Sequence, residues 1–273
     1  RDAQESRGLG DVYKRQPLSI VPLEVRLDDE LYEDNVTITP EEFYKKINSG
    51  MKPSTSQPSV GKILEVYENL KAQGFERIVA FTVTSKLSGT YSSFTQASEL
   101  IEGIDIKIID TLQVARIVGC AVEKIIKDFS NGNLAYENIE DECRKLLKQQ
   151  NILVTIENMD FLYAGGRLTK TQFLLSNLLN ILPIITIKDG ILDVSGKHRG
   201  MSKVLTKICE EIKEKDPKSL IILYTTDDLL KKAQDVVAKT FGNIETEAII
   251  ISPVIGTHAG PRAVGIGYLE YEK

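Results

Sequence analysis

Short apolar runs alternate with stretches of helical periodicity through the first half of the chain. Residues 77–83 (RIVAFTV) are β-branched and aromatic and predict a buried strand, whereas the apolar residues of 114–125 recur at helical spacing. Thr39, Pro40 and Glu42 form a helix start with a capping box. This repetition of strands and helices predicts a parallel sheet with helices on both faces. We expect strands at 19–26, 77–83 and 106–110, and helices at 39–50, 60–73, 90–102, 114–125 and 137–150.

The pattern changes after an apolar run at 152–156. Two further apolar runs flank Lys188-Asp189-Gly190, and the Asp-Gly pair predicts a tight β-hairpin. A hairpin among helices is typical of a mixed α/β domain. We expect strands at 183–187, 191–195, 220–224, 248–251 and 263–271, and helices at 201–213 and 228–241.

These elements predict an α/β protein of two domains. The N-terminal parallel-sheet α/β domain spans 17–155, and the C-terminal mixed α/β domain spans 156–273. No flexible linker separates them, so we expect a large shared interface, which is a favoured place for a ligand site.

The first sixteen residues follow neither the strand nor the helix period. They read RDAQESRGLGDVYKRQ, are polar, and lack the apolar stretch of a signal peptide. We interpret residues 1–16 as a non-native segment and leave them out of the fold. A native chain terminus without regular structure is the alternative.

Composition excludes several classes of function. The chain has 273 residues and a formal net charge of −5, which argues against a nucleic-acid partner because phosphate contacts usually need a basic surface. Its only histidines are His198 and His258, too few for a histidine-rich metal centre, and no cofactor or metal is expected. The three distant cysteines favour a reducing cytoplasm. No run of about 18 apolar residues predicts a transmembrane segment.

Three polar clusters carry candidate chemistry, at 53–59, 84–91 and 256–261. The second follows the buried strand at 77–83, and open α/β sheets bind ligands beyond the carboxyl ends of their strands. Its hydroxyls, with the free amides of the next helix, suit an oxyanion. Helix capping is the structural alternative for the first two clusters. For His258, in the glycine-rich third cluster, the alternative is an ordinary surface histidine.

Familiar catalytic motifs do not occur in the sequence. Lys86 and Thr90 flank Ser88 where a nucleophile elbow would need glycines. Neither a Walker loop nor a dinucleotide-binding glycine motif is present. The sequence therefore offers groups that bind an anion without an obvious nucleophile and base.

Five segments in order resemble the DegV family, bacterial fatty-acid-binding proteins that serve as the carrier component of fatty acid kinase. The segments are Thr55-Ser56-Gln57-Pro58-Ser59, Ser85-Lys86-Leu87-Ser88-Gly89-Thr90-Tyr91, Gly165-Gly166-Arg167-Leu168, the Lys197-His198-Arg199-Gly200 turn and Gly256-Thr257-His258-Ala259-Gly260-Pro261. The resemblance implies one long-chain fatty acid between two domains, presented to a separate ATP-dependent kinase subunit for acyl-phosphate formation and phospholipid synthesis. It implies a cytoplasmic lipid-binding carrier that is not itself an enzyme, and it leaves transient membrane contact open.

The resemblance also implies roles for individual residues. The ligand carboxylate is bound by Thr55, with Ser56 as the alternative, and by Ser88, the Gly89 amide and His258. Two arginines, Arg167 and Arg199, match family residues at the entrance that serve the kinase partner and the acyl phosphate. One departure is at the start, where residues 1–16 stand in place of the family's first strand and its Asp-Ser-Thr segment.

Apolar stretches could supply the wall of a tunnel for the acyl chain, or belong to an ordinary core. They lie at 161–163, 173–175, 178–179 and 181–182. Two competing hypotheses remain. One is a serine esterase or phosphotransferase in which His258 activates Ser88. The other is a binding module for a different small carboxylate or phosphate, with a short polar pocket.

Overall fold

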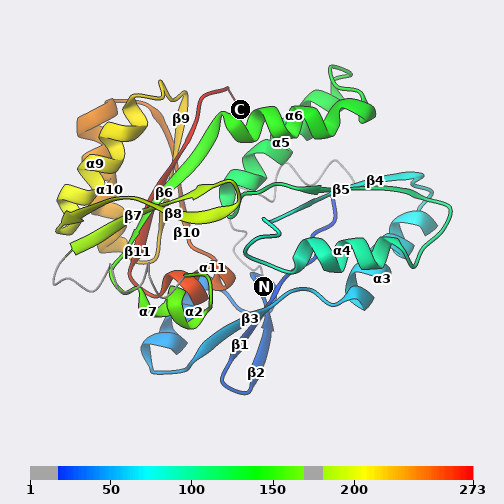
Figure 1. Cartoon of the computed structure of the whole chain (residues 1–273), viewed down its shortest axis with the longest axis horizontal. Helices are drawn as coiled ribbons and strands as arrows, with labels where there is room; N and C mark the ends of the chain where they lie inside the picture. Colours follow the sequence, from blue (N-terminus) through cyan, green and yellow to red (C-terminus); the bar gives the residue numbers. More distant parts are fainter. Residues whose placement is uncertain (1–17, 169–180, 273) are drawn as a thin grey trace, which may run out of the picture.

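A computed structural model describes residues 18–168 and 181–272, and it has the predicted α/β class (Figure 1). Its largest sheet has six strands in the order β10-β9-β11-β6-β7-β8. Among the pairs of adjacent strands in this sheet, β9 and β10 are parallel and the other four pairs are antiparallel. The bounds are β6 Gln150–Ile156, β7 Ile181–Lys188, β8 Ile191–Arg199, β9 Ser219–Tyr224, β10 Glu245–Ile250 and β11 Ala263–Leu269.

Two helices cover one face of this sheet, α9 (Met201–Lys213) and α10 (Asp227–Phe241). Apolar residues of α9 such as Leu205 and Ile208 pack with Leu153 of β6 and Ile222 of β9 in one buried cluster. The helix α9 has the predicted bounds. The candidate site lies on the opposite face of the sheet. That face packs against α2 (Pro40–Asn48), α5 (Arg116–Ser130), α7 (Asp160–Ala164) and α11 (Pro253–Ala259).

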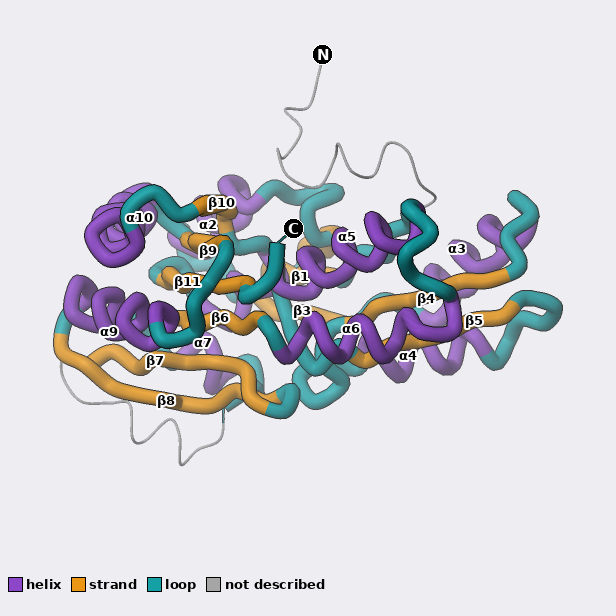
Figure 2. The backbone as a smooth tube through the Cα atoms, turned by 90° about the horizontal axis from the view of Figure 1, so that it is seen from above, coloured by secondary structure: helices purple, strands orange, loops and turns teal. Residues whose placement is uncertain are grey.

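A second unit contains the parallel pair β4 (Arg77–Thr82) and β5 (Asp105–Asp110). Residues on one face of the pair, Ile78 and Ile106, pack against α3 and α4, whereas Phe81 and Ile109 pack against α5 and α6. This arrangement puts helices on both faces, as predicted (Figure 2). The helix bounds are α3 Val60–Ala72, α4 Thr90–Ser98, α5 Arg116–Ser130 and α6 Ile139–Lys148, with a short 3₁₀ helix η1 at Tyr136–Asn138.

A three-stranded antiparallel sheet, β2-β1-β3, lies between these units in Figure 1. Its strands are β1 Glu24–Leu27, β2 Glu30–Glu33 and β3 Pro53–Ser56. Helix α2 (Pro40–Asn48) begins with the predicted capping box, in which the Glu42 amide donates to Thr39 Oγ1 and the Thr39 amide donates to the Glu42 carboxylate. Two short helices complete this region, α7 (Asp160–Ala164) and α11 (Pro253–Ala259).

The structure differs from the sequence prediction in several places. The strand expected at 19–26 is only Glu24–Leu27 (β1), and it pairs antiparallel with β2 and β3 instead of joining a parallel sheet. The first polar cluster begins as strand β3, because residues 53–56 pair with all four residues of β1. The third cluster was expected to be a loop, but His258 lies on helix α11, which Gly260 ends with φ of 76°. The expected turn at 197–200 is the end of strand β8, where Arg199 pairs with Ile181.

The predicted hairpin is confirmed. Lys188 pairs with Ile191, so the turn has two residues, and both take positive φ, 50° at Asp189 and 80° at Gly190. The division into domains at residue 155 stays a prediction. The proposed non-native segment 1–16 and the apolar stretches at 173–175 and 178–179 lie outside the described residues. Within 18–168 and 181–272, no helix is long and apolar enough to cross a membrane.

Candidate functional site

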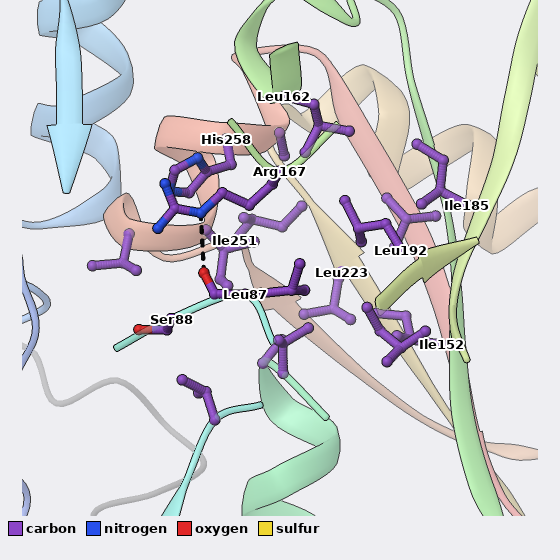
Figure 3. A pocket seen from close by; sticks show the side chains of 18 of the residues that line it. Leu87, Ser88, Ile152, Leu162, Arg167, Ile185, Leu192, Leu223, Ile251 and His258 are labelled. Atoms are coloured by element: carbon purple, nitrogen blue, oxygen red, sulfur yellow. Dashed lines mark hydrogen bonds between the residues drawn. The ribbon is translucent and has the colours of Figure 1, made fainter. Parts of the chain in front are cut away.

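A largely apolar cavity lies between the open face of the six-stranded sheet and the loops that follow β4 and β5 (Figure 3). One end carries polar side chains, and the rest of the wall is mostly aliphatic. The polar lining residues include Thr55, Ser88, Arg167 and His258. The aliphatic lining residues include Val83, Leu87, Ile152, Val154, Ile156, Leu162, Ile185, Ile187, Leu192, Leu223, Ile251, Val254 and Ile255.

Because side chains alternate between the two faces of a strand, one strand can contribute both to the hydrophobic core and to the cavity wall. Ile152, Val154 and Ile156 alternate along β6 and line the cavity, whereas Leu153 between them packs under α9 and α10. The sequence could not separate these two roles, because both faces of β6 are largely buried. Sheet strands therefore supply much of the aliphatic wall. Of the described parts of the predicted tunnel stretches, 161–163 and 181–182, only Leu162 lines the cavity.

Thr55 and His258 meet at the polar end of the cavity. Thr55 Oγ1 lies 2.9 Å from His258 Nε2, although the residues are 203 positions apart. Thr55 comes from β3, and the strand period turns the next residue, Ser56, to the outside. There the Ser56 hydroxyl donates to Glu24 Oε2 at 3.0 Å. The structure thus brings Thr55 to the site and places Ser56 away from it.

The imidazole of His258 is partly buried and lies in a restricted space. Its Nδ1 is buried and has no hydrogen-bond partner among the described residues. A Cβ atom at Gly165 would lie 2.2 Å from this nitrogen, so the ring needs a glycine there. Burial lowers the pKa of His258 to about 4, and the positive charge of Arg167 acts in the same direction. His258 is therefore neutral near pH 7.

Arg167 connects the turn after α7 to the loop after β4. Its Nε donates to the Leu87 carbonyl at 3.0 Å, shown by the dashed line in Figure 3, and its Nη1 donates to the Gly165 carbonyl. These bonds hold the guanidinium beside His258 and close to Ser88 (Figure 3). A fixed cation at this place favours an anionic ligand group.

Ser88 and Gly89 precede helix α4. Ser88 Oγ lies 2.9 Å from Thr90 Oγ1, and the Thr90 amide donates to Ser88 Oγ at 3.3 Å. A Cβ atom at Gly89 would overlap Gln57 Oε1, 1.6 Å away, so the close approach of Gln57 requires glycine. Both residues line a second hollow that shares Ser88 and Arg167 with the cavity, and we describe it as the mouth.

The β7–β8 hairpin fixes the loop that carries Ser88. Thr84 Oγ1 donates to the Gly190 carbonyl at 2.8 Å, and Lys86 Nζ donates to the Asp189 carbonyl at 2.7 Å. The loop after β5 also lines the cavity, and Ala115 there has φ of 60° and ψ of −154°. Such a conformation is rare for a residue with a side chain and is often found at functional sites.

Arg199 lies elsewhere. It is exposed at the far end of β8 from Leu192 and lines neither the cavity nor the mouth. The described residues thus bring together Thr55, Ser88, Arg167 and His258, with Gly89 at the mouth, while Ser56 and Arg199 stay apart. Of the hydrophobic lining residues in the described parts of the chain, the sequence predicts only Leu162, because nothing in the local sequence distinguishes the others from core residues. No group of three or more acidic, histidine or cysteine side chains in the described segments could bind a metal ion.

Residues 10–271 match the sequence profile of the DegV family, which is described as a family of uncharacterised proteins. The chain belongs to the DegV family. A DegV domain-containing protein of Caldanaerobacter subterraneus subsp. tengcongensis is 32% identical, and the alignment covers 95% of this chain and 94% of that protein.

Solved DegV structures have the same fold. A DegV family protein from Thermus thermophilus, described by its fatty acid binding, is 28% identical with a TM-score of 0.81, over 91% of this chain and 90% of that one. DegV of Bacillus subtilis, described as a fatty acid binding protein, is 25% identical with a TM-score of 0.82, over 91% and 90%. The Streptococcus pneumoniae Fatty Acid Kinase (Fak) B3 protein, loaded with linoleic acid, is 20% identical with a TM-score of 0.79, over 92% and 90%. This last likeness concerns the fold.

Proposed function

We propose that this DegV protein binds one long-chain fatty acid, with the carboxylate at the polar end of the cavity and the acyl chain along its aliphatic wall. Thr55, Ser88, the Gly89 amide and His258 would bind the carboxylate. The observation that carries the proposal is the composition of this cavity, which has hydroxyl, imidazole and guanidinium groups at one end and mostly aliphatic side chains elsewhere.

Physical chemistry supports this ligand class. A carboxylate that leaves water needs hydrogen bonds in the protein, and the polar end supplies donors of that kind. An acyl chain gains about 0.8 kcal/mol for each buried CH₂ group, so sixteen carbons contribute on the order of 10 kcal/mol before the ordering costs of binding. A short polar ligand would leave the aliphatic wall without a partner.

We further propose that the protein presents the bound carboxylate to a separate ATP-dependent kinase in the cytoplasm and releases an acyl phosphate. The mouth supports this step, because Ser88 and Arg167 line both the cavity and the hollow that opens beside it. Arg167 would balance the charge of the acyl phosphate. Arg199 lies outside the mouth and would act through the kinase contact surface. The chain is then a carrier that performs no chemistry by itself.

The esterase alternative needs a hydrogen bond from Ser88 to His258. In the structure Ser88 Oγ contacts Thr90 Oγ1, and His258 Nε2 contacts Thr55 Oγ1. The base and the candidate nucleophile therefore have other partners. The geometry favours a binding site over a nucleophilic one.

Mass spectrometry of organic extracts of the purified protein tests the binding step. We expect about one long-chain fatty acid for each chain, and its replacement by added fatty acid in exchange experiments. T55V and H258N should lose much of this lipid, whereas the matched variant S56A should retain it. Extracts without lipid, together with no uptake of added fatty acid, would refute the proposal.

The kinase step has a separate test. The loaded protein is mixed with a fatty acid kinase subunit and ATP, and acyl phosphate is trapped with hydroxylamine as the hydroxamate. We expect product only when both proteins are present, and less product with R167Q. Product formed by this chain with ATP alone would contradict the carrier role.

A further inference from the structure

Asp34 lies just after β2 and contacts the helix that carries His258. Its amide donates to the Leu23 carbonyl at 2.9 Å, which fixes the residue against the start of β1. Its carboxylate Oδ1 accepts the Val254 amide of α11 at 3.0 Å, across 220 positions of sequence. The Ser252 hydroxyl also donates to this carboxylate. The contact joins the first strands of the chain to the last described helix.

Helix α11 has no cap of its own. Its N-cap residue Ser252 makes no capping hydrogen bond with its side chain, and Pro253 in the first turn has no N–H group. The Val254 amide is therefore the first donor of the helix, and Asp34 satisfies it from another element. Without this acceptor a partly buried N–H group would lose its partner.

Neighbouring contacts leave α11 little freedom. The Tyr44 hydroxyl donates to the Ile251 carbonyl at 3.0 Å. A Cβ atom at Gly256 would lie 2.5 Å from the Tyr44 hydroxyl oxygen and 2.9 Å from Phe43, so α2 lies directly against the helix. The first turn of α11 is thus packed closely against α2.

His258 follows Val254 by four residues, about one helical turn. Asp34 and Thr55 belong to the same three-stranded unit, because β1 pairs with both β2 and β3. One unit therefore contacts the helix at two points, through Asp34 at the first turn and through Thr55 at His258. The first contact is made at the N-terminal end of the helix, and the second is made about one turn further along.

We propose that Asp34 is a positioning residue for the carboxylate site, because its hydrogen bond to Val254 holds α11 where the His258 imidazole meets Thr55. The affinity consequence rests on the proposed fatty acid function, whereas the effect on His258 does not. Burial raises the pKa of Asp34, which means that the carboxylate is desolvated at this place. An asparagine could accept the same hydrogen bond without the charge.

NMR of the two imidazoles tests the proposal directly. His258 and His198 are the only histidines, and His198 lies on β8, so it serves as an internal reference. In D34A we expect the ¹⁵N and ¹³C signals of the His258 ring to shift while those of His198 stay. The affinity for a fluorescent fatty acid should fall about fivefold, the typical effect of one lost hydrogen bond. D34N should restore both properties in large part.

A matched control is E33A, which removes the neighbouring carboxylate of β2 that pairs with Lys62 of α3. It should leave the His258 signals and the affinity unchanged. If D34A does not fold, S252A replaces it, because this change removes one hydrogen bond to Asp34 and should shift the His258 signals by less. Unchanged His258 signals in the folded variant would overturn the proposal. If the wild-type protein binds no fatty acid, the proposed function fails, but the ring signals still decide the role of Asp34.

Discussion

Thr55 Oγ1 and His258 Nε2 lie 2.9 Å apart at the polar end of the cavity. Valine has the shape of threonine but cannot form this hydrogen bond, so T55V should leave the imidazole without its partner. We expect fatty acid affinity to fall about fivefold or more, since a typical hydrogen bond contributes about 1 kcal/mol. Titration calorimetry with a long-chain fatty acid measures the change. S56A, on the outer face of the same strand, should bind like the wild-type protein, and equal losses in both variants would contradict this assignment.

Burial is the larger cause of the lowered pKa of His258, and the charge of Arg167 adds to it. R167Q should therefore raise the pKa of His258 from about 4 towards the ordinary value, whereas R167K keeps the charge and should change the pKa less. An NMR titration of the ring measures both. R199Q, which alters an arginine outside the cavity, is the matched control, and an equal shift in R199Q and R167Q would rule out a local effect.

Alanine substitutions at Gly165 and at Gly166 should act on the protein for different physical reasons. Gly165 has an ordinary φ of −72°, but a Cβ atom there would lie 2.2 Å from His258 Nδ1. Gly166 has φ of 72°, and a Cβ atom there would have no neighbour within 4 Å, so alanine is strained only by its backbone. G165A should displace the imidazole and weaken ligand binding strongly. G166A should cost about 1 kcal/mol of stability and leave binding nearly unchanged.

Binding measurements and denaturant unfolding distinguish the two effects. A G165A protein that binds fatty acid as tightly as G166A does would show that the imidazole has more room than the structure gives it.

The partly buried imidazole of His258 also makes the stability of the protein depend on pH. In the unfolded chain a histidine titrates near pH 6.5, whereas burial lowers the pKa of His258 to about 4 in the folded chain. Between these values the unfolded state binds a proton that the folded state does not, so stability decreases as the pH falls. From about pH 7.5 to about pH 5 this contribution is about 2 kcal/mol.

Urea unfolding of the ligand-free protein at both pH values measures the loss. H258N lacks the titrating group and should lose about 2 kcal/mol less over this range than the wild-type protein. Other groups, Asp34 among them, contribute equally to both proteins and cancel in the difference. The same pH dependence in both proteins would mean that His258 titrates normally.

Elements with local signals could be predicted from the sequence. The capping box at Thr39 and Glu42 and the turn at Asp189 and Gly190 are specified by residues that touch one another within a few positions. Each forms in the structure as the local pattern indicates. These signals fix the start of α2 and the register of the β7–β8 hairpin.

The third cluster shows where local reasoning fails. Its glycines indicate a loop, yet Gly256 lies inside α11, where the close approach of Tyr44 and Phe43 leaves no room for a side chain. Gly260 ends the helix at φ of 76°, and Phe161 packs where a side chain would be. Both glycines are required by residues far away in the sequence, and a single sequence does not reveal those contacts. The residues of the cavity wall cannot be recognised in the sequence for a similar reason, because apolar residues such as Ile152 have the same pattern as core residues.

The contact between Thr55 and His258 has a consequence for protein synthesis. The two halves of the site are made 203 residues apart, and Asp34 and Val254 are separated by 220. The residues of β1, β2 and β3 are synthesised first, and the proposed carboxylate site cannot be complete until α11 has emerged from the ribosome. Nascent chains should therefore not capture fatty acid, and a truncated product that ends before α11 would not compete with the finished protein for lipid.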